Sequence, residues 1–283
     1  MEFSAGSPPT WLRAKVGVKG CALVRLAIMA LSLSGVGGTE AAAEGASLDA
    51  LVRAYPDQLA GYDSTYLIWR DGTRMPLSDG QAYKSFEEML RHGSILDQLR
   101  LTYPAGVSAA AIVPQSDPGR IRNRAFFDKM YGDCWRGEVS PQLVSVGWLP
   151  GSWGRTVRMT AVNGVAARLA EISAELDVLP VSIKRYVYPP AGTYNCRTVA
   201  DTGEPSMHSW GVAIDINSAY ADYWLWPRGV SANTIPPEII DVFERHGFIW
   251  GGKWSHYDTM HFEYRPELIN TPSATARSAT APH

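Results

Sequence analysis

One carboxylate stands in an otherwise apolar run, and it limits the folds that the chain can adopt. In segment 211–217, Val212, Ile214 and Ile216 alternate with Ala213 and Asp215. This alternation predicts a strand whose three branched residues share one face. Asp215 then lies on the opposite face, in apolar surroundings where a charged group needs a partner. The fold must therefore bring a cation or a hydrogen-bond donor to this strand.

Two histidines are candidates for that partner. His208 precedes Asp215 by seven residues, so a straight strand would separate them, and we expect His208 to come from a loop bent at Gly211. His261 lies in segment 260–264, which also predicts a strand. Two imidazoles and one carboxylate are a common ligand set for catalytic zinc, with iron as the second option. A buried histidine–carboxylate pair without metal is the alternative.

A second carboxylate accompanies His261. Asp258 precedes it by three residues. If the chain turns between the two, the Asp258 carboxylate can face the metal without binding it. A general base belongs at that position, within hydrogen-bond reach of an attacking water.

The N-terminal segment has the layout of a secretory signal. Basic residues, an apolar run over 26–33 and small residues ending at Ala43 follow one another. The apolar run is shorter than the ~20 residues that span a bilayer. We therefore expect 1–43 to be a cleaved signal peptide, with an uncleaved anchor as the alternative. The protein is then exported, to the periplasm or to the extracellular space and cell wall, without a stable membrane span after signal cleavage.

Two cysteines, Cys134 and Cys196, lie outside the signal segment. An even pair in an exported protein predicts a disulfide. Their spacing is not that of a zinc knuckle. Two free buried thiols are the alternative.

The composition is that of a globular protein without a basic surface. Apolar residues make up 46% and charged residues 19% of the chain, which argues against a disordered or coiled-coil chain. The 26 basic and 28 acidic side chains give a net charge of −2. We expect no nucleic-acid partner, because phosphate binding needs clustered Lys and Arg.

Hydrophobic spacing predicts the remaining elements. Helices are expected over 86–90, 95–99, 126–131, 162–176 and 237–246, and strands over 181–188, 211–217, 248–250 and 260–264. Asp71-Gly72 predicts a hairpin turn. Segment 114–124 reads as a polar loop, and nothing in 44–150 has catalytic spacing.

The two histidine-bearing segments resemble the zinc D-alanyl-D-alanine peptidases of the VanY and VanX type, which are grouped with lysostaphin-like enzymes and the hedgehog domain. The first family motif is Ser-x-His, four residues that include Gly, and Ala-x-Asp. The second is an acidic residue three positions before His, after a Trp-rich turn. The matching residues are Ser206, His208, Gly211, Ala213, Asp215, Asp258 and His261, with Trp250 and Trp254 in the turn.

The resemblance covers about 160–268 and implies the ligands, the base and the fold. His208, Asp215 and His261 are expected to bind one Zn²⁺ per chain, with Asp258 as the catalytic base. The expected fold is α+β, with a small antiparallel sheet that carries the single zinc site and helices that flank it. The chain then divides into the signal peptide 1–43, an N-terminal extension 44–150 of unknown role, a zinc peptidase core 151–270 and a disordered tail 271–283.

The family also holds a substrate carboxylate with an Arg upstream of the Ser-x-His motif. Arg197 is in the fitting place, and a guanidinium suits a bidentate carboxylate contact. Arg185 is the rival, and a surface salt bridge is the alternative for either residue.

Three further residues are expected at the substrate. Ser206 orients the site through a hydrogen bond, with a simple turn residue as the alternative. Trp254 walls the groove, as Trp210 and Trp250 could, although core packing is the default for at least one of the three. His256 donates to the developing oxyanion, with a partly exposed histidine that has no such role as the alternative. Glu263 holds a ligand histidine.

The implied function is an exported, monomeric zinc peptidase that cuts peptidoglycan stem peptides. The base is Asp rather than Glu, and it lies in the motif Asp-x-Met-His-Phe-Glu over 258–263. Both features resemble the L-alanyl-D-glutamate endopeptidase branch of the family. The first rival is a D-Ala-D-Ala carboxypeptidase of the same family. The second is a non-catalytic, zinc-containing protein that binds the cell wall.

Overall fold

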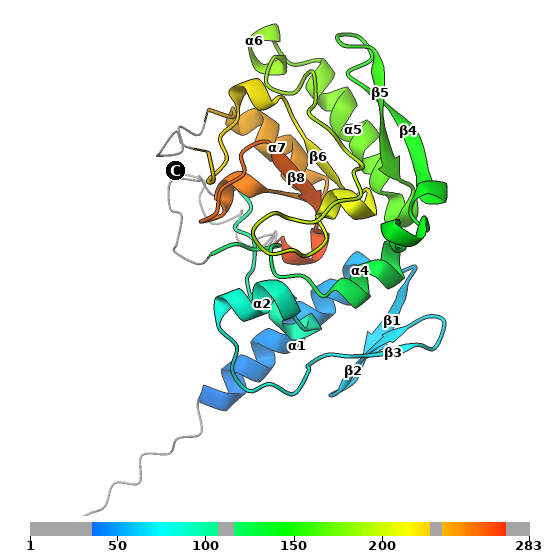
Figure 1. Ribbon diagram of the computed structural model, residues 1–283, viewed down its shortest axis with the longest axis vertical. Coiled ribbons are helices and arrows are strands. Elements are labelled where there is room, and N and C mark those ends of the chain that lie inside the picture. The colour runs from blue at the N-terminus through cyan, green and yellow to red at the C-terminus, as the bar shows by residue number, and fades with distance from the viewer. Residues whose placement is uncertain (1–35, 107–115, 227–233, 270–283) are drawn as a thin grey trace, which may run out of the picture.

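Small antiparallel sheets and short helices alternate along the computed structural model, which describes residues 36–106, 116–226 and 234–269 (Figure 1). The strands are β1 Leu59–Tyr62, β2 Tyr66–Trp69, β3 Arg74–Pro76, β4 Leu143–Trp148, β5 Arg155–Thr160, β6 Ala213–Asp215, β7 Phe248–Trp250 and β8 His261–Tyr264. The helices are α1 Val36–Ala54, α2 Phe86–His92, α3 Ile95–Leu99, α4 Arg124–Tyr131, α5 Val165–Asp177, α6 Val181–Lys184 and α7 Pro237–Arg245. This mixture confirms the α+β class.

The sheet β6-β8-β7 lies at the centre of the C-terminal half, with β8 between its two antiparallel neighbours. Helix α7 packs on this sheet, and its Phe243 stacks on Phe262 of β8 with ring centroids 3.9 Å apart. Helix α5 contacts both α7 and the hairpin β4–β5. Its buried residues Val165, Leu169, Ile172 and Leu176 recur at helical spacing, which explains why this face turns inward. The sheet therefore has a rigid, apolar support.

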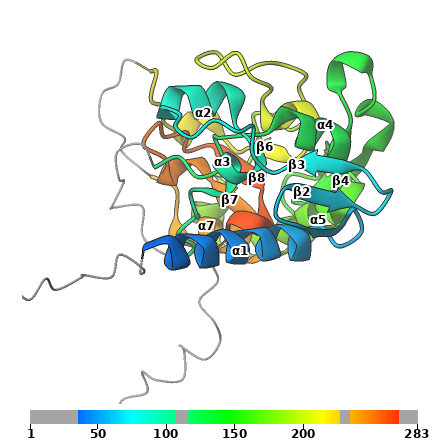
Figure 2. The ribbon, with the colours of Figure 1, turned by 90° about the horizontal axis from the view of Figure 1, so that it is seen from below.

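The N-terminal extension shares the hydrophobic core with the C-terminal half. A single cluster of buried residues runs from Leu48 in α1 to Leu268, and α1 lies along one side of the molecule (Figure 2). Tyr55, just beyond α1, donates a hydrogen bond of 2.7 Å to Glu267. The hairpin β4–β5 crosses the boundary predicted at residue 150. Residues on both sides of that boundary therefore pack together.

The strand predicted over 181–188 is wrong. Val181–Lys184 forms the short helix α6, and the Pro180 carbonyl accepts hydrogen bonds from the backbone N–H of Ile183 and Lys184, at 2.9 and 3.0 Å. The alternation of apolar residues misled because burial in this segment is uneven, with Val187 fully buried in the core and Val181 at the surface. Val181 is 69% exposed, and no strand of the described chain pairs with this segment.

The other expected elements are present with small shifts. The helix predicted from residue 162 begins at Val165, because Asn163 and Gly164 have positive φ and close a 3₁₀ turn first. Asp71-Gly72 forms the turn between β2 and β3, where the Trp69 N–H donates to Thr73 at 2.9 Å. No helix in the described ranges has the length and apolarity that a membrane crossing requires. Most of the predicted signal peptide and all of the tail 271–283 lie outside these ranges.

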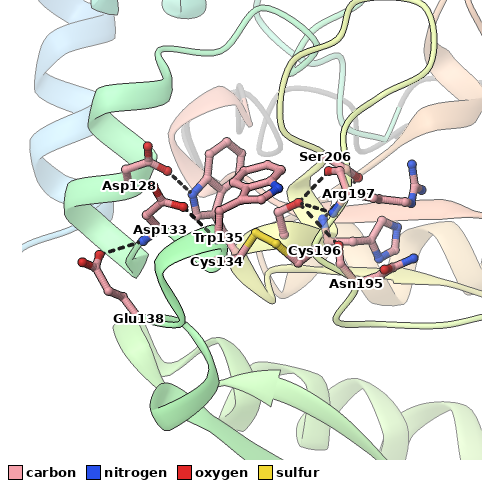
Figure 3. Close-up of a disulfide and its surroundings, with 12 residues drawn as sticks. Asp128, Asp133, Cys134, Trp135, Glu138, Asn195, Cys196, Arg197 and Ser206 are labelled. Carbon is pink, nitrogen blue, oxygen red and sulfur yellow. Dashed lines mark hydrogen bonds between the residues drawn. A yellow bond between two sulfur atoms is a disulfide. The ribbon is translucent and has the colours of Figure 1, made fainter.

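The pair Cys134 and Cys196 forms the expected disulfide, which links the 3₁₀ turn after α4 to the loop before the Ser-x-His motif (Figure 3). The two Cα atoms are 5.7 Å apart. The bond therefore joins the N-terminal extension to the segment that carries Arg197.

Candidate active site

A tight turn brings His208 to the sheet. Residues Met207–Trp210 form a 3₁₀ turn, and the Ser206 side chain accepts a hydrogen bond of 3.4 Å from the His208 backbone N–H. Gly211 ends the turn with φ +67°, where a Cβ would lie 2.6 Å from Leu143. The bend expected at Gly211 is present, and its positive φ favours glycine at this position.

The sheet places the other two candidate ligands side by side. Asp215 of β6 and His261 of β8 are directly opposed in the antiparallel register. The Asp215 Oδ1 atom lies 3.0 Å from His261 Nδ1 and 3.1 Å from His208 Nε2, and the two imidazole nitrogens are 3.2 Å apart. The three side chains predicted as ligands therefore converge on one point.

This triangle has the size that a tetrahedral metal needs. Ligand atoms ~2.0–2.1 Å from a tetrahedral zinc are roughly 3.3 Å from one another, close to the distances seen here. The three residues also form the group in the described chain whose donor atoms could hold a metal ion. The donor set of two imidazoles and a carboxylate, with room for a fourth ligand, thus fits zinc.

Each histidine is oriented by a second hydrogen bond. His208 Nδ1 faces the Thr193 carbonyl oxygen in a short contact, and His261 Nε2 is 2.9 Å from Glu263 Oε2. Donation of these N–H groups leaves the converging nitrogens, Nε2 of His208 and Nδ1 of His261, free to bind a metal. The contact expected between Glu263 and a ligand histidine is present.

Buried cations hold Glu263 in its ionised form. Its carboxylate is fully buried and lies 2.9 Å from Arg122 Nη2 and 3.3 Å from Arg265 Nη1. Burial by itself raises the pKa of Glu263, but the charge of Arg122 and the bond to His261 outweigh it and lower the pKa to about 2. The carboxylate therefore stays charged and can anchor His261.

The site attracts a cation between its three donors. Burial lowers the pKa of His261, but its bonds to Asp215 and Glu263 raise the pKa to about 10. Burial raises the pKa of Asp215, and the two neighbouring imidazoles hold it well below its usual range. In the protein without metal, a proton on His261 compensates the negative charge of Asp215. A bound metal ion would replace that proton.

Asp258 lies beside the triangle without joining it. Its backbone is fixed by hydrogen bonds to Gly251 and from His261, and its Oδ1 atom is buried without a hydrogen-bond partner among the described residues. Burial, followed by the negative charge of Asp215, raises the pKa of Asp258 to about 7. A carboxyl group with that pKa can both accept and return a proton near neutral pH.

Asp215 and His261 of the triangle, together with Asp258, border a cavity of about 320 Å³. The residues that line it come from strands β6 and β8 and from loops: Arg120, Arg122, Arg197, Val199, Ala200, Ser206, Asp215, Tyr223, Trp224, Trp226, Trp254, His256, Asp258, Met260 and His261. All four residues predicted to bind substrate are therefore placed at the cavity.

Arg197 is the candidate arginine that the fold brings to this cavity. Its side chain is exposed, and its backbone N–H donates to Ser209 Oγ at 3.1 Å next to the disulfide (Figure 3). The rival Arg185 lies outside the cavity lining and stacks over Tyr186 and Tyr220, 5.0 and 5.3 Å from their ring centroids. The geometry therefore favours Arg197, the residue preferred from the sequence, over its rival Arg185.

The tryptophans divide between the cavity and the core. Trp254 lines the cavity, packs 5.6 Å from the His261 ring and donates from Nε1 to the Pro118 carbonyl at 2.7 Å. Trp210 and Trp250 are buried in the core, as expected for at least one of the three.

The polar loop before α4 contributes residues that the sequence did not reveal. Asp117 contacts His256, while Arg120 and Arg122 line the cavity. Gly119 allows the close approach, since a Cβ there would lie 2.5 Å from Ile249. The available signal was the charged run around Asp117-Pro118-Gly119, which is also typical of an ordinary surface turn.

Comparison with known proteins agrees with this geometry. A family model described as D-alanyl-D-alanine carboxypeptidase matches residues 200–264, a range that includes His208, Asp215, Asp258 and His261. Neither the search of curated proteins nor that of solved structures found a match. The family match supports a peptidase related to the VanY-type enzymes and, coarsely, a peptidoglycan-derived substrate.

Proposed function

We propose that the protein is an exported, zinc-dependent peptidase that hydrolyses amide bonds in the stem peptides of peptidoglycan. One observation carries this proposal: His208, Asp215 and His261 converge within 3.0–3.2 Å of one another beside the carboxyl group of Asp258. The disulfide supports export, since such bonds persist in oxidising compartments.

The chain's own residues supply proton transfer and positioning. When bound, zinc supplies a Lewis acid that polarises a scissile carbonyl and makes water more acidic. Asp258 takes a proton from the attacking water and passes it to the leaving nitrogen. Asp258 suits this role because its carboxyl group lies at the cavity beside the triangle, and its Oδ1 atom has no hydrogen-bond partner among the described residues.

The finer proposal is cleavage between L-Ala and D-Glu. It rests on Asp258 as the base and on the sequence motif of segment 258–263. A second candidate, the D-Ala-D-Ala carboxypeptidase, is favoured by the description of the matched family and by the exposed guanidinium of Arg197 at the cavity, which suits a terminal carboxylate.

Digestion of purified peptidoglycan tests the activity and the bond. The protein loaded with zinc is incubated with and without a chelator, and the products are identified by mass. A new amino terminus on D-Glu, lost with the chelator, is the expected result. Release of D-Ala would establish the carboxypeptidase instead.

The same experiment addresses the non-catalytic alternative. The enzymatic proposal would be overturned if the zinc-loaded protein gave no products at any pH. In that case peptidoglycan binding that Asp258→Asn leaves unchanged would support the non-catalytic alternative. An exposed carboxylate variant, Asp57→Asn, is the matched control, because Asp57 lies outside the cavity lining.

A further inference from the structure

Asp117 is a fully buried carboxylate in the N-terminal extension, and it faces the segment that carries His256. Its Oδ1 atom accepts hydrogen bonds from Ser255 Oγ at 2.6 Å and from the His256 backbone N–H at 3.1 Å. Its Oδ2 atom lies 2.5 Å from His256 Nδ1 and 3.5 Å from Arg120 Nη1. Four donor positions therefore surround the two carboxylate oxygens.

This surrounding fixes the proton on the imidazole ring. The His256 backbone N–H at Oδ1 and the Arg120 guanidinium at Oδ2 can only donate, so both carboxylate oxygens of Asp117 act as acceptors. Asp117 is therefore the acceptor and His256 Nδ1 carries the hydrogen. In the neutral imidazole the other nitrogen, Nε2, is then an acceptor.

The ring of His256 is held at the cavity by its neighbours. It lines the cavity together with Asp258 and Trp254. The ring of Trp224 meets the His256 ring edge to face, with the ring centroids 4.6 Å apart. The His256 side chain is 28% exposed. The loop of Asp117 also fixes the adjoining backbone, since Ser255 N–H donates to the Ser116 carbonyl at 3.2 Å. Nε2 has no hydrogen-bond partner within the described part of the chain.

We propose that Asp117 is a positioning residue, which holds His256 as the Nδ1-protonated tautomer so that Nε2 accepts a hydrogen bond from a backbone N–H of the bound stem peptide. The substrate in this inference rests on the proposed function. Asp117 lies in the extension 44–150, so the extension would complete the substrate site. The acceptor role replaces the donor role expected for His256 from the sequence.

Nitrogen NMR of the histidine-labelled, zinc-loaded protein reads the tautomer without any turnover. We expect a protonated Nδ1 and an unprotonated Nε2 for His256 in the wild type. Ser255→Ala is the matched control, because it removes one hydrogen bond of Asp117 and leaves the contact with Nδ1. A protonated Nε2 with a bare Nδ1 in the wild type would overturn the proposal.

A double-mutant cycle then separates positioning from a purely structural role. Asp117→Asn and His256→Ala should each raise KM for a stem pentapeptide about 10-fold, the value of one hydrogen bond, with a smaller change in kcat. The double variant Asp117→Asn/His256→Ala should be no worse than His256→Ala alone. Effects that multiply to about 100-fold would show that Asp117 acts independently of His256 and would overturn the proposal.

Binding measurements keep this test apart from the proposed function. The same variants are compared in the Asp258→Asn background, where the dissociation constant of the pentapeptide replaces KM. Absence of products from the wild type would refute the enzymatic proposal, while the tautomer and the binding contrast would still support positioning. A pentapeptide that binds equally to all variants would overturn the role of His256, whatever the activity. If Asp117→Asn does not fold, the wild-type tautomer and the effect of His256→Ala on binding decide.

Discussion

Replacement of Glu263 by Gln should destabilise the protein and weaken its metal site together. The carboxylate is fully buried between Arg122 and Arg265 and accepts the Nε2 hydrogen of His261. Glutamine keeps the shape but removes the charge, so two buried guanidinium groups lose part of their compensation. Breaking a buried ion pair on one side typically costs about 3–5 kcal/mol.

The shifted pKa gives a magnitude in the same range. The pKa of Glu263 falls from 4.5 to about 2 on folding, which corresponds to roughly 3 kcal/mol in the free energy of unfolding. Because the folded-state pKa is depressed, this stabilisation is complete above pH 4.5 and is lost as the pH falls to about 2. The Gln variant should therefore be less stable at neutral pH and lose less of its stability across that acid range.

Urea unfolding of the zinc-free protein at several pH values measures this effect. Glu87→Gln is the matched control, since Glu87 is 64% exposed in its pair with Arg91 and should contribute at most about 1 kcal/mol. Chelator competition should show a zinc affinity lowered about 10–100-fold for Glu263→Gln. A loss of stability no larger than that of the control, with unchanged zinc affinity, would refute the reasoning.

Three further predictions concern the site and the disulfide beside it. Asp258→Asn should retain stoichiometric zinc but lose about 100-fold or more in kcat, as measured with soluble muropeptides, and full activity would remove it as the base. His208→Ala should lose the metal in elemental analysis, whereas the exposed His92→Ala should keep it; retained zinc would exclude His208 as a ligand. Serine at Cys134 and Cys196 should lower the free energy of unfolding by about 4 kcal/mol, given their separation of 62 residues, and raise KM through the loop of Arg197; an unchanged urea midpoint would contradict this.

Local patterns succeeded where their physical cause was local. The apolar spacing of α5 and α7 marks the faces that are buried, and the Asp71-Gly72 turn needs only its own backbone. The strand expected over 181–188 failed because alternation implies a strand only where another strand offers hydrogen bonds. Here the Pro180 carbonyl instead accepts the N–H groups of a helical turn.

The sequence by itself determined the chemistry at the centre of the site. Asp215, the two histidines and Asp258 belong to two short motifs. The spacing of residues within each motif predicts that these side chains act together. The tertiary structure alone decided the surroundings, because it brings Asp117 and Arg122 to the site from a distant loop. These contacts join residues that are far apart in the sequence, so no local pattern in the chain predicts them. The packing of the whole core brings the residues together.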